Sequence, residues 1–183
     1  MKKKIAIILA DGFEEIEAVV PADVFRRLEF ELVIAGLSKT VTGSHGIRIQ
    51  ADCLLSELKE PELDAIFLPG GMPGSANLRD SAEVLELVRK VNARKGIVSA
   101  ICAAPIALKA AGVIEGKTVT SHPSVKNELK GCNHTGKLTE TDANIVSGKG
   151  PGAAFEFAVK VASALGKAAE AESLMDNMFV PRQ

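Results

Sequence analysis

Short apolar runs recur along the chain at lengths typical of strands. Most lack internal polar residues, which is the pattern of strands buried on both faces of a parallel sheet. The runs are Lys4–Leu9, Glu31–Gly36, Ala65–Pro69, Gly96–Ala100, Thr118–Ser121 and Asn144–Ser147. They predict the central strands of a mostly parallel sheet.

Between these runs, apolar residues return at three- and four-residue spacing, as in helices with one buried face. Val84, Leu87, Val88 and Val91 form one such stripe. The helices predicted in this way are Glu14–Arg27, Asp80–Ala93, Pro105–Ala111 and Ala153–Leu165. Strands that alternate with helices predict an α/β fold, in which crossover helices cover both faces of the sheet.

Local signals refine this picture. Residues 40–51 alternate apolar and polar side chains around Gly43 and Gly46, which predicts a hairpin with an exposed face. Asp80 and Glu83 have the spacing of a capping box and predict a helix start there. Because no repeat or long linker divides the sequence, we expect a single domain over residues 1–183.

The composition and charge are those of an ordinary globular protein. Hydrophobic residues make up 46% and charged residues 25%, and 22 basic against 23 acidic residues give a formal charge of −1. This balance gives no electrostatic reason to expect nucleic acid or an anionic membrane as a partner. No apolar stretch approaches the roughly twenty residues that a membrane-spanning helix needs.

The cellular compartment is suggested by the N-terminus and the cysteines. The basic start imitates a secretory signal, but its apolar run is short and acidic residues follow at once, so it fits a first strand better. Cys53, Cys102 and Cys132 show neither the spacing of a disulfide framework nor paired metal-ligand spacing. We therefore expect free thiols in the cytoplasm and no bound metal.

Cys102 is the candidate nucleophile. It follows a predicted buried strand and precedes a predicted helix, with the small residues Ala100 and Ala104 two positions to either side. Such a strand-to-helix turn brings the backbone close to its neighbours and presents the nucleophile at the sheet edge. The free amides of the following helix would lower the pKa of the thiol. The alternative is a buried structural cysteine.

Glu17 is the candidate acid/base. On a helix that starts near Glu14, its neighbours include Phe13 and Val20, whereas Glu14 and Glu15 are expected to face water. A carboxyl in apolar surroundings has a raised pKa and can donate a hydrogen bond to a thiolate. The alternative is a solvated acid in an acidic first helical turn.

His122 is the best placed of the three histidines. It lies at a predicted strand end, and Pro123 holds the chain extended, so the imidazole could orient or protonate a group at Cys102. The alternative is a strand-end histidine with a local hydrogen bond. His45 in the hairpin and His134 in a polar stretch are expected at the surface.

Two glycine-rich segments complete the candidate site. Gly70 and Gly71 offer backbone amides without shielding side chains, and the Gly71 amide together with that of Ala103 could form an oxyanion hole. Gly150 and Pro151 resemble a phosphate loop only superficially, because Pro151 removes an amide donor and no Gly-Lys-Ser/Thr follows. We interpret them as a tight turn lining the pocket.

These motifs resemble those of the ThiJ/PfpI superfamily, and within it the branch of the Parkinsonism-associated deglycases. The matching segments are residues 10–17, 68–71, 100–105, 121–123 and 150–157. The resemblance spans nearly the whole chain. It implies a flavodoxin-like three-layer sandwich and a homodimer. It also implies that Cys102 is the nucleophile, with Glu17 as its hydrogen-bonded acid/base and His122 beside them.

The sequence departs from this family pattern at three positions. The peptidase branch has His directly after the cysteine, whereas this chain has Ala103, which argues against a protease. His45 and Lys149 stand where relatives carry Arg and contact small anions or the dimer partner. For assembly, the residues near Ile16, Val19, Val20 and Phe25, with the hairpin, offer a surface for a two-fold dimer.

The resulting functional hypothesis is the handling of reactive dicarbonyls, either free methylglyoxal and glyoxal or their early adducts on proteins. A Cys102 hemithioacetal, proton transfer by Glu17 and hydrolysis of a thioester would give lactate or glycolate. No cofactor is required. The first alternative is an oxidative-stress sensor or chaperone that acts through oxidation of Cys102. The second is a cysteine hydrolase or amidase.

Overall fold

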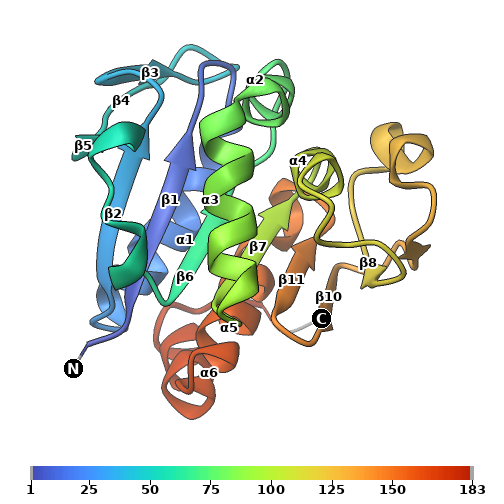
Figure 1. Ribbon diagram of the computed structural model, residues 1–183. Coiled ribbons are helices and arrows are strands. Elements are labelled where there is room, and N and C mark those ends of the chain that lie inside the picture. The colour runs from blue at the N-terminus through green and yellow to red at the C-terminus, as the bar shows by residue number, and fades with distance from the viewer. Residues whose placement is uncertain (1, 182–183) are drawn as a thin grey trace.

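A seven-stranded sheet forms the middle layer of the molecule (Figure 1). The computed structural model describes residues 2–181, so the ends of the single-domain prediction, residues 1 and 182–183, lie outside the described part. The strand order is β10-β11-β7-β6-β1-β2-β5, and only β10 runs antiparallel to its neighbour. The strands are β1 Lys4–Leu9, β2 Glu31–Gly36, β5 Cys53–Leu54, β6 Ala65–Leu68, β7 Ile97–Ile101, β10 Thr139–Asp142 and β11 Ile145–Gly148.

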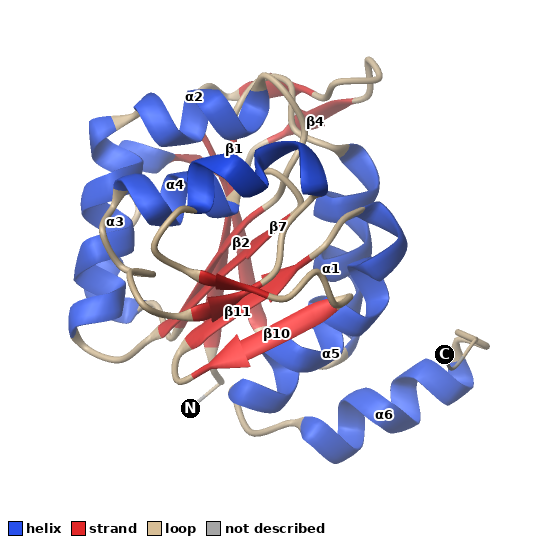
Figure 2. Ribbon diagram, turned by 90° about the vertical axis from the view of Figure 1, so that its right-hand side faces the viewer, coloured by secondary structure: helices blue, strands red, loops and turns tan. Residues whose placement is uncertain are grey.

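Helices cover both faces of this sheet, as Figure 2 shows edge-on. One face carries α1 Glu15–Arg27 and α5 Ala154–Ala164, with α6 Ala168–Asn177 beside α5. The other carries α2 Gly74–Asp80, α3 Ala82–Ala93 and α4 Pro105–Ala110. Side chains of β1 alternate between the two cores: Ile5 and Ile7 pack toward α1 and α5, and Ala6 and Ile8 toward α3 and α4. The predicted α/β sandwich is confirmed.

Two small sheets lie outside the central one. The predicted hairpin is confirmed as the antiparallel pair β3 Thr40–Thr42 and β4 Arg48–Gln50. The parallel pair β8 Thr118–Val119 and β9 Asn133–His134 stands next to β10. The described residues also include the 3-10 helices η1 Leu55–Glu57, η2 Glu60–Glu62, η3 Pro123–Leu129 and η4 Pro151–Ala153. Within residues 2–181, no helix has the length and apolar character needed to cross a membrane.

Several predicted elements differ from those observed. The run Thr118–Ser121 does not join the central sheet, because only its first two residues pair, and they pair with β9. The helix start at Asp80 is wrong: Ser81 caps α3 by accepting a hydrogen bond from the Val84 amide, and Asp80 ends the separate helix α2. Helix α6 was not predicted, since it buries little apolar surface and its periodic signal is weak.

Candidate active site

Three neighbouring strands, β1, β6 and β7, end at the same edge of the sheet and bring the predicted motifs together. Glu17 lies in the first turn of α1, Gly70 follows β6, and Cys102 follows β7. A Cβ atom on Gly70 would lie 2.5 Å from Cys102 Cβ and 2.5 Å from Glu17 Oε2. Because real Cβ contacts are essentially never this short, only glycine lets the two side chains meet.

Cys102 occupies a strained turn. Its φ angle is 62°, in the left-handed region that disfavours residues with a side chain. The Cys102 amide donates to Gly148 O at 2.8 Å, which ties the turn to the end of β11. Ala100 and Ala104 are both fully buried, as the close packing of such a turn requires. The half-buried thiol is therefore fixed by its backbone.

The Glu17 carboxyl is fully buried against this turn. Its Oε2 accepts a hydrogen bond from the Gly70 amide at 2.8 Å. Its Oε1 is also buried and has no hydrogen-bond partner among residues 2–181. Burial raises the pKa of Glu17 to about 7, and the charge of Glu14 acts in the same direction, while the interactions with the Cys102 thiol and the Gly70 amide oppose them. The predicted apolar setting of this carboxyl is thus present.

The expected low pKa of Cys102 is contradicted. Burial raises the pKa of the Cys102 thiol to about 12, and the charge and hydrogen bond of Glu17 add to the rise. The amides of Gly71 and Ala103 donate to the sulfur and oppose this shift. The helix behind the cysteine is short and begins only at Pro105, so its dipole does not outweigh burial and a carboxylate.

Glu17 and Cys102 therefore titrate as one pair. The first proton leaves with a pKa of about 7 and the second with a pKa of about 12. Between these values the pair holds a single proton, and the higher pKa of the thiol places that proton on sulfur. The site therefore holds a thiol next to a carboxylate base rather than a free thiolate.

The expectation that Glu14 and Glu15 face water is wrong. Both are buried, because the chain enters α1 from the β1 loop and the β3–β4 hairpin folds over its first turn. Glu14 is the N-cap of α1, and its Oε2 accepts a hydrogen bond from the Glu17 amide at 2.8 Å. The Glu14 carboxyl thus helps to fix the backbone at Glu17.

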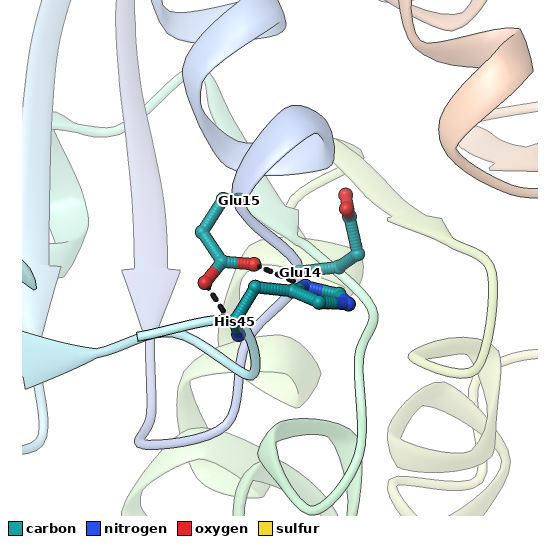
Figure 3. A group of neighbouring side chains, drawn as sticks. All are labelled: Glu14, Glu15 and His45. Atoms are coloured by element: carbon teal, nitrogen blue, oxygen red, sulfur yellow. Dashed lines mark hydrogen bonds and ion pairs between the residues drawn. The ribbon is translucent and has the colours of Figure 1, made fainter. Parts of the chain in front are cut away.

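Glu15 forms an ion pair with His45 from the hairpin (Figure 3). The His45 amide lies 2.7 Å from Glu15 Oε1, and the ring Nδ1 lies 2.8 Å from Oε2. Burial would raise the pKa of Glu15, but the hydrogen bonds from His45 outweigh it and lower the pKa, while Glu15 raises the pKa of His45. The exposed His45 ring was expected; its buried partner was not.

This pair also belongs to a group with potential metal ligands. Atoms of Glu14, Glu15 and His45 lie within 4.8 Å of one another. No metal was expected from the spacing of the Cys and His residues, because spacing along the sequence cannot reveal a group whose members come from a helix start and a distant hairpin. In the structure the best acceptors of the group already serve hydrogen bonds: those of Glu15 bind His45, and Glu14 Oε2 binds the Glu17 amide.

His122 reaches Cys102 through its backbone. The His122 amide donates to Cys102 O at 2.8 Å, while the ring is exposed to solvent. Its Nδ1 lies 2.7 Å from Ser124 Oγ and accepts a hydrogen bond from the Ser124 amide at 3.2 Å. Because Nδ1 is an acceptor, the neutral ring carries its hydrogen on Nε2. Sequence reasoning missed Ser124, whose only signal is its place two residues after the histidine.

The remaining predicted site residues lie in two loops. Gly71 has a φ of 90°, and its amide points at the Cys102 sulfur together with that of Ala103. Gly150 and Pro151 begin η4 at the start of α5, one short loop beyond Gly148. The Cys102 amide is bonded to Gly148 O rather than to either of these two residues.

An α/β sandwich of this order, with a cysteine on a strained turn and a buried glutamic acid against it, defines a narrow structural class. Residues 3–164 match the model of the DJ-1/PfpI family. The chain belongs to that family, and the resemblance noted in the sequence is confirmed.

Relatives and solved structures agree with this assignment. The Parkinson disease protein 7 homolog of Danio rerio is 38% identical over 169 residues, with 89% of each chain covered. The crystal structure of Drosophila melanogaster DJ-1beta superposes with a TM-score of 0.95 at 35% identity, covering 100% of both chains. The glutathione-independent glyoxalase DJR-1.2 of Caenorhabditis elegans is 32% identical over 177 residues, covering 95% of this chain and 94% of that protein.

Proposed function

We propose that this protein converts reactive dicarbonyls such as methylglyoxal and glyoxal, or their early adducts on proteins, to lactate or glycolate. The observation that carries the proposal is the buried Glu17 carboxyl, with a pKa of about 7, held against the Cys102 thiol. General acid/base groups work best when their pKa lies near the operating pH. The glyoxalase name of the C. elegans relative supports the same reaction class.

The first step is attack of the Cys102 sulfur on the aldehyde carbon of methylglyoxal. Ionised Glu17 takes the thiol proton as the S–C bond forms, since the raised pKa of the thiol keeps it protonated without a base. Glu17 then passes this proton to the aldehyde oxygen, which completes a hemithioacetal and leaves Glu17 ionised for the next step. The amides of Gly71 and Ala103, which lower the pKa of the Cys102 thiol, would stabilise the developing oxyanion.

The second step moves hydrogen between the two carbons. Glu17 removes the proton from the hemithioacetal carbon, an enediol forms, and a proton returns to the neighbouring carbon. The product is a lactoyl thioester on Cys102. Water then cleaves the thioester, which releases lactate and restores the thiol, so the overall change adds one water to methylglyoxal. The Nε2 hydrogen of His122 is available to assist these proton transfers.

The direct test is lactate formation from methylglyoxal by the purified protein without glutathione. We expect lactate in proportion to methylglyoxal consumed, and we expect kcat/KM to rise with pH through about 7 as the Cys102–Glu17 pair loses its first proton. Consumption of methylglyoxal without lactate would indicate only adduct formation and would refute turnover.

The second candidate is redox sensing at the same cysteine. The amides of Gly71 and Ala103 point at the sulfur and could equally hold the oxygens of a sulfinic acid. Protonated Glu17 would donate to such a group. Mass spectrometry after peroxide treatment, combined with the lactate assay, separates the candidates, because a sensor gains two oxygens on Cys102 and forms no lactate.

The proposal includes a two-fold dimer in the cytoplasm, where a reducing environment keeps Cys102 a thiol. Ile16 and Val19 on α1 are about half exposed, and Ile47 in the hairpin is 56% exposed. These side chains form an apolar surface that a second copy would cover. Phe25, which was expected there, is fully buried in the core instead. Sedimentation at micromolar concentration tests this arrangement, and a 19.2 kDa species alone would refute it.

A further inference from the structure

A second hydrogen-bonded pair lies behind the His122 turn. Ser121 is fully buried, and its Oγ lies 2.9 Å from His134 Nε2 and donates to the His122 carbonyl oxygen at 3.1 Å. The His122 amide in turn donates to Cys102 O at 2.8 Å. These bonds link the ring of His134 to the backbone of Cys102 through the Ser121 hydroxyl and the backbone of His122.

The direction of these bonds follows from the number of hydrogens. A serine hydroxyl has one hydrogen, and here it serves the His122 carbonyl. The network therefore assigns the remaining hydrogen to His134 Nε2, which donates to Ser121 Oγ. Both the neutral Nε2–H ring and the doubly protonated ring can make this bond.

His134 was expected at the surface from the sequence, but its ring is half-buried and is bonded to the buried Ser121 hydroxyl. His134 is half-buried on β9, and the next amide, that of Thr135, bonds Val119 O at 3.0 Å on β8. Burial lowers the pKa of His134, and the charge of Lys126 adds to this shift. Without the ring, the buried Ser121 oxygen would lose its donor and the hydroxyl would be held by the His122 carbonyl alone, which costs free energy.

We propose that His134 is a positioning residue for the chemistry at Cys102. Through Ser121 it holds the His122 carbonyl, and the amide of the same residue supports the Cys102 turn by its bond to Cys102 O. This role for His134 rests on the proposed dicarbonyl reaction only where turnover is measured. The geometry can be tested without any substrate.

The kinetic test compares His134→Ala and His134→Gln with a control on the same strand. Loss of one buried hydrogen bond changes a rate by roughly tenfold, so we expect kcat of His134→Ala to fall by that factor with KM nearly unchanged. The glutamine amide can donate in place of Nε2, so His134→Gln should recover most of kcat. Asn133→Ala, which alters only an exposed contact with Thr118, should behave as wild type.

The structural test is hydrogen exchange of the His122 amide. We expect exchange to speed up by roughly tenfold in His134→Ala and in Ser121→Ala, which removes the same bond from its other end. Amides within β7 should keep the wild-type rates, which also shows that the variants fold. An unchanged His122 amide in a folded variant would overturn the inference, as would faster exchange with unchanged kcat.

The two proposals fail in distinguishable ways. If wild-type protein forms no lactate, the proposed dicarbonyl function is wrong. The positioning role of His134 is then tested by the rate at which iodoacetamide alkylates Cys102, in place of kcat. A change of about threefold or more in His134→Ala, with Asn133→Ala unchanged, would then support positioning of the turn, since it is within the effect of one hydrogen bond. Equal alkylation rates in all three proteins would overturn it.

Discussion

The two sides of the Cys102 turn are built in different ways. On the acid side, Glu17 is fully buried and its carboxyl is bound by the backbone amide of Gly70. On the histidine side, the His122 ring is exposed and is held by the Ser124 side chain and amide. The acid side is thus part of the core, whereas the histidine side is attached to it by a few hydrogen bonds.

This difference separates two kinds of contribution. The raised pKa of Glu17 comes mainly from burial, so it is a property of the fold and persists as long as the fold does. The hydrogen bonds of the His122 ring compete with water and contribute only modestly. We expect substitutions on the acid side to abolish chemistry and those on the histidine side to tune it.

The largest expected effect is that of Cys102→Ala, which removes the group common to both sides. Lactate formation should fall to the uncatalysed background, since no other nucleophile stands at this position. Cys132→Ala is the matched control, because the Cys132 thiol donates to Ile114 O away from the site. Measurable turnover in folded Cys102→Ala protein would remove the covalent step from the mechanism.

Next in size is Glu17→Gln, which keeps a polar side chain of the same shape but cannot move a proton. Loss of general acid/base catalysis typically costs about a hundred- to ten-thousand-fold in rate. At the same time the pKa of Cys102 should fall, because the charge of Glu17 helps to raise it. Alkylation of Cys102 at pH 9 should therefore speed up while lactate formation collapses.

Those opposite responses identify Glu17 as both base and electrostatic neighbour. The alkylation rate and the lactate rate are measured on the same preparation, with Glu172→Gln on α6 as a control for the chemical change. Lactate formation in folded Glu17→Gln within about a factor of two of wild type would remove Glu17 from the mechanism, given the size of acid/base effects.

The positions of the site residues could be predicted from the sequence, but the electrostatics of the site could not. Cys102 and Glu17 could be identified from local patterns, because each pattern involves only residues that are neighbours in the sequence. For Cys102 the pattern is a strand followed by small residues, and for Glu17 it is a helix start with apolar neighbours. The pKa of Cys102 could not be predicted in this way. It depends on burial and on the Glu17 carboxylate from helix α1, both of which arise only when β1, β6 and β7 lie side by side.

The fold shows the same limit. The buried strands of the central sheet were predicted, because short continuous apolar runs are typical of strands that are buried on both faces. The place of Thr118–Val119 was not, since a short apolar run pairs equally well with β9 at the margin as with the main sheet. The Glu15–His45 pair joins a helix start to a hairpin tip, so no pattern in either segment reveals it.

The acid side also makes a prediction for stability. The pKa of Glu17 rises from an ordinary 4.5 in the unfolded chain to about 7 in the fold. Between these values the folded state holds more protons, so the free energy of unfolding falls as pH rises from 4.5 to 7 and levels off above 7. The decline due to Glu17 amounts to roughly 3 kcal/mol.

Urea unfolding of wild type and Glu17→Gln at pH 5 and pH 8 isolates this contribution. The variant lacks the titrating group, so its stability relative to wild type should increase between the two pH values by up to roughly 3 kcal/mol. The other carboxyls are common to both proteins and cancel in the difference. A difference that does not change with pH would mean that burial leaves the Glu17 pKa at its ordinary value.

A smaller effect is expected for His122→Ala. The ring is exposed, and a hydrogen bond that competes with water is worth about 1 kcal/mol, so kcat should fall by roughly tenfold or less. His45→Ala serves as the control, because it also removes an exposed imidazole. A loss from His122→Ala as large as that from Glu17→Gln would show that the two sides of the turn contribute equally.

The smallest effect belongs to Ser124→Ala, which leaves the His122 ring in place and removes one of its supports. The Ser124 hydroxyl lies 2.7 Å from Nδ1, while the Ser124 amide, also bonded to Nδ1, is kept. The ring should therefore retain its hydrogen on Nε2 but sample more orientations, and kcat should fall by about threefold with KM unchanged. The Nδ1 and Nε2 resonances of His122 in nitrogen NMR report the tautomer directly. A shift of the hydrogen to Nδ1 in the variant would mean that the Ser124 hydroxyl, and not the Ser124 amide, keeps the ring in the tautomer with its hydrogen on Nε2.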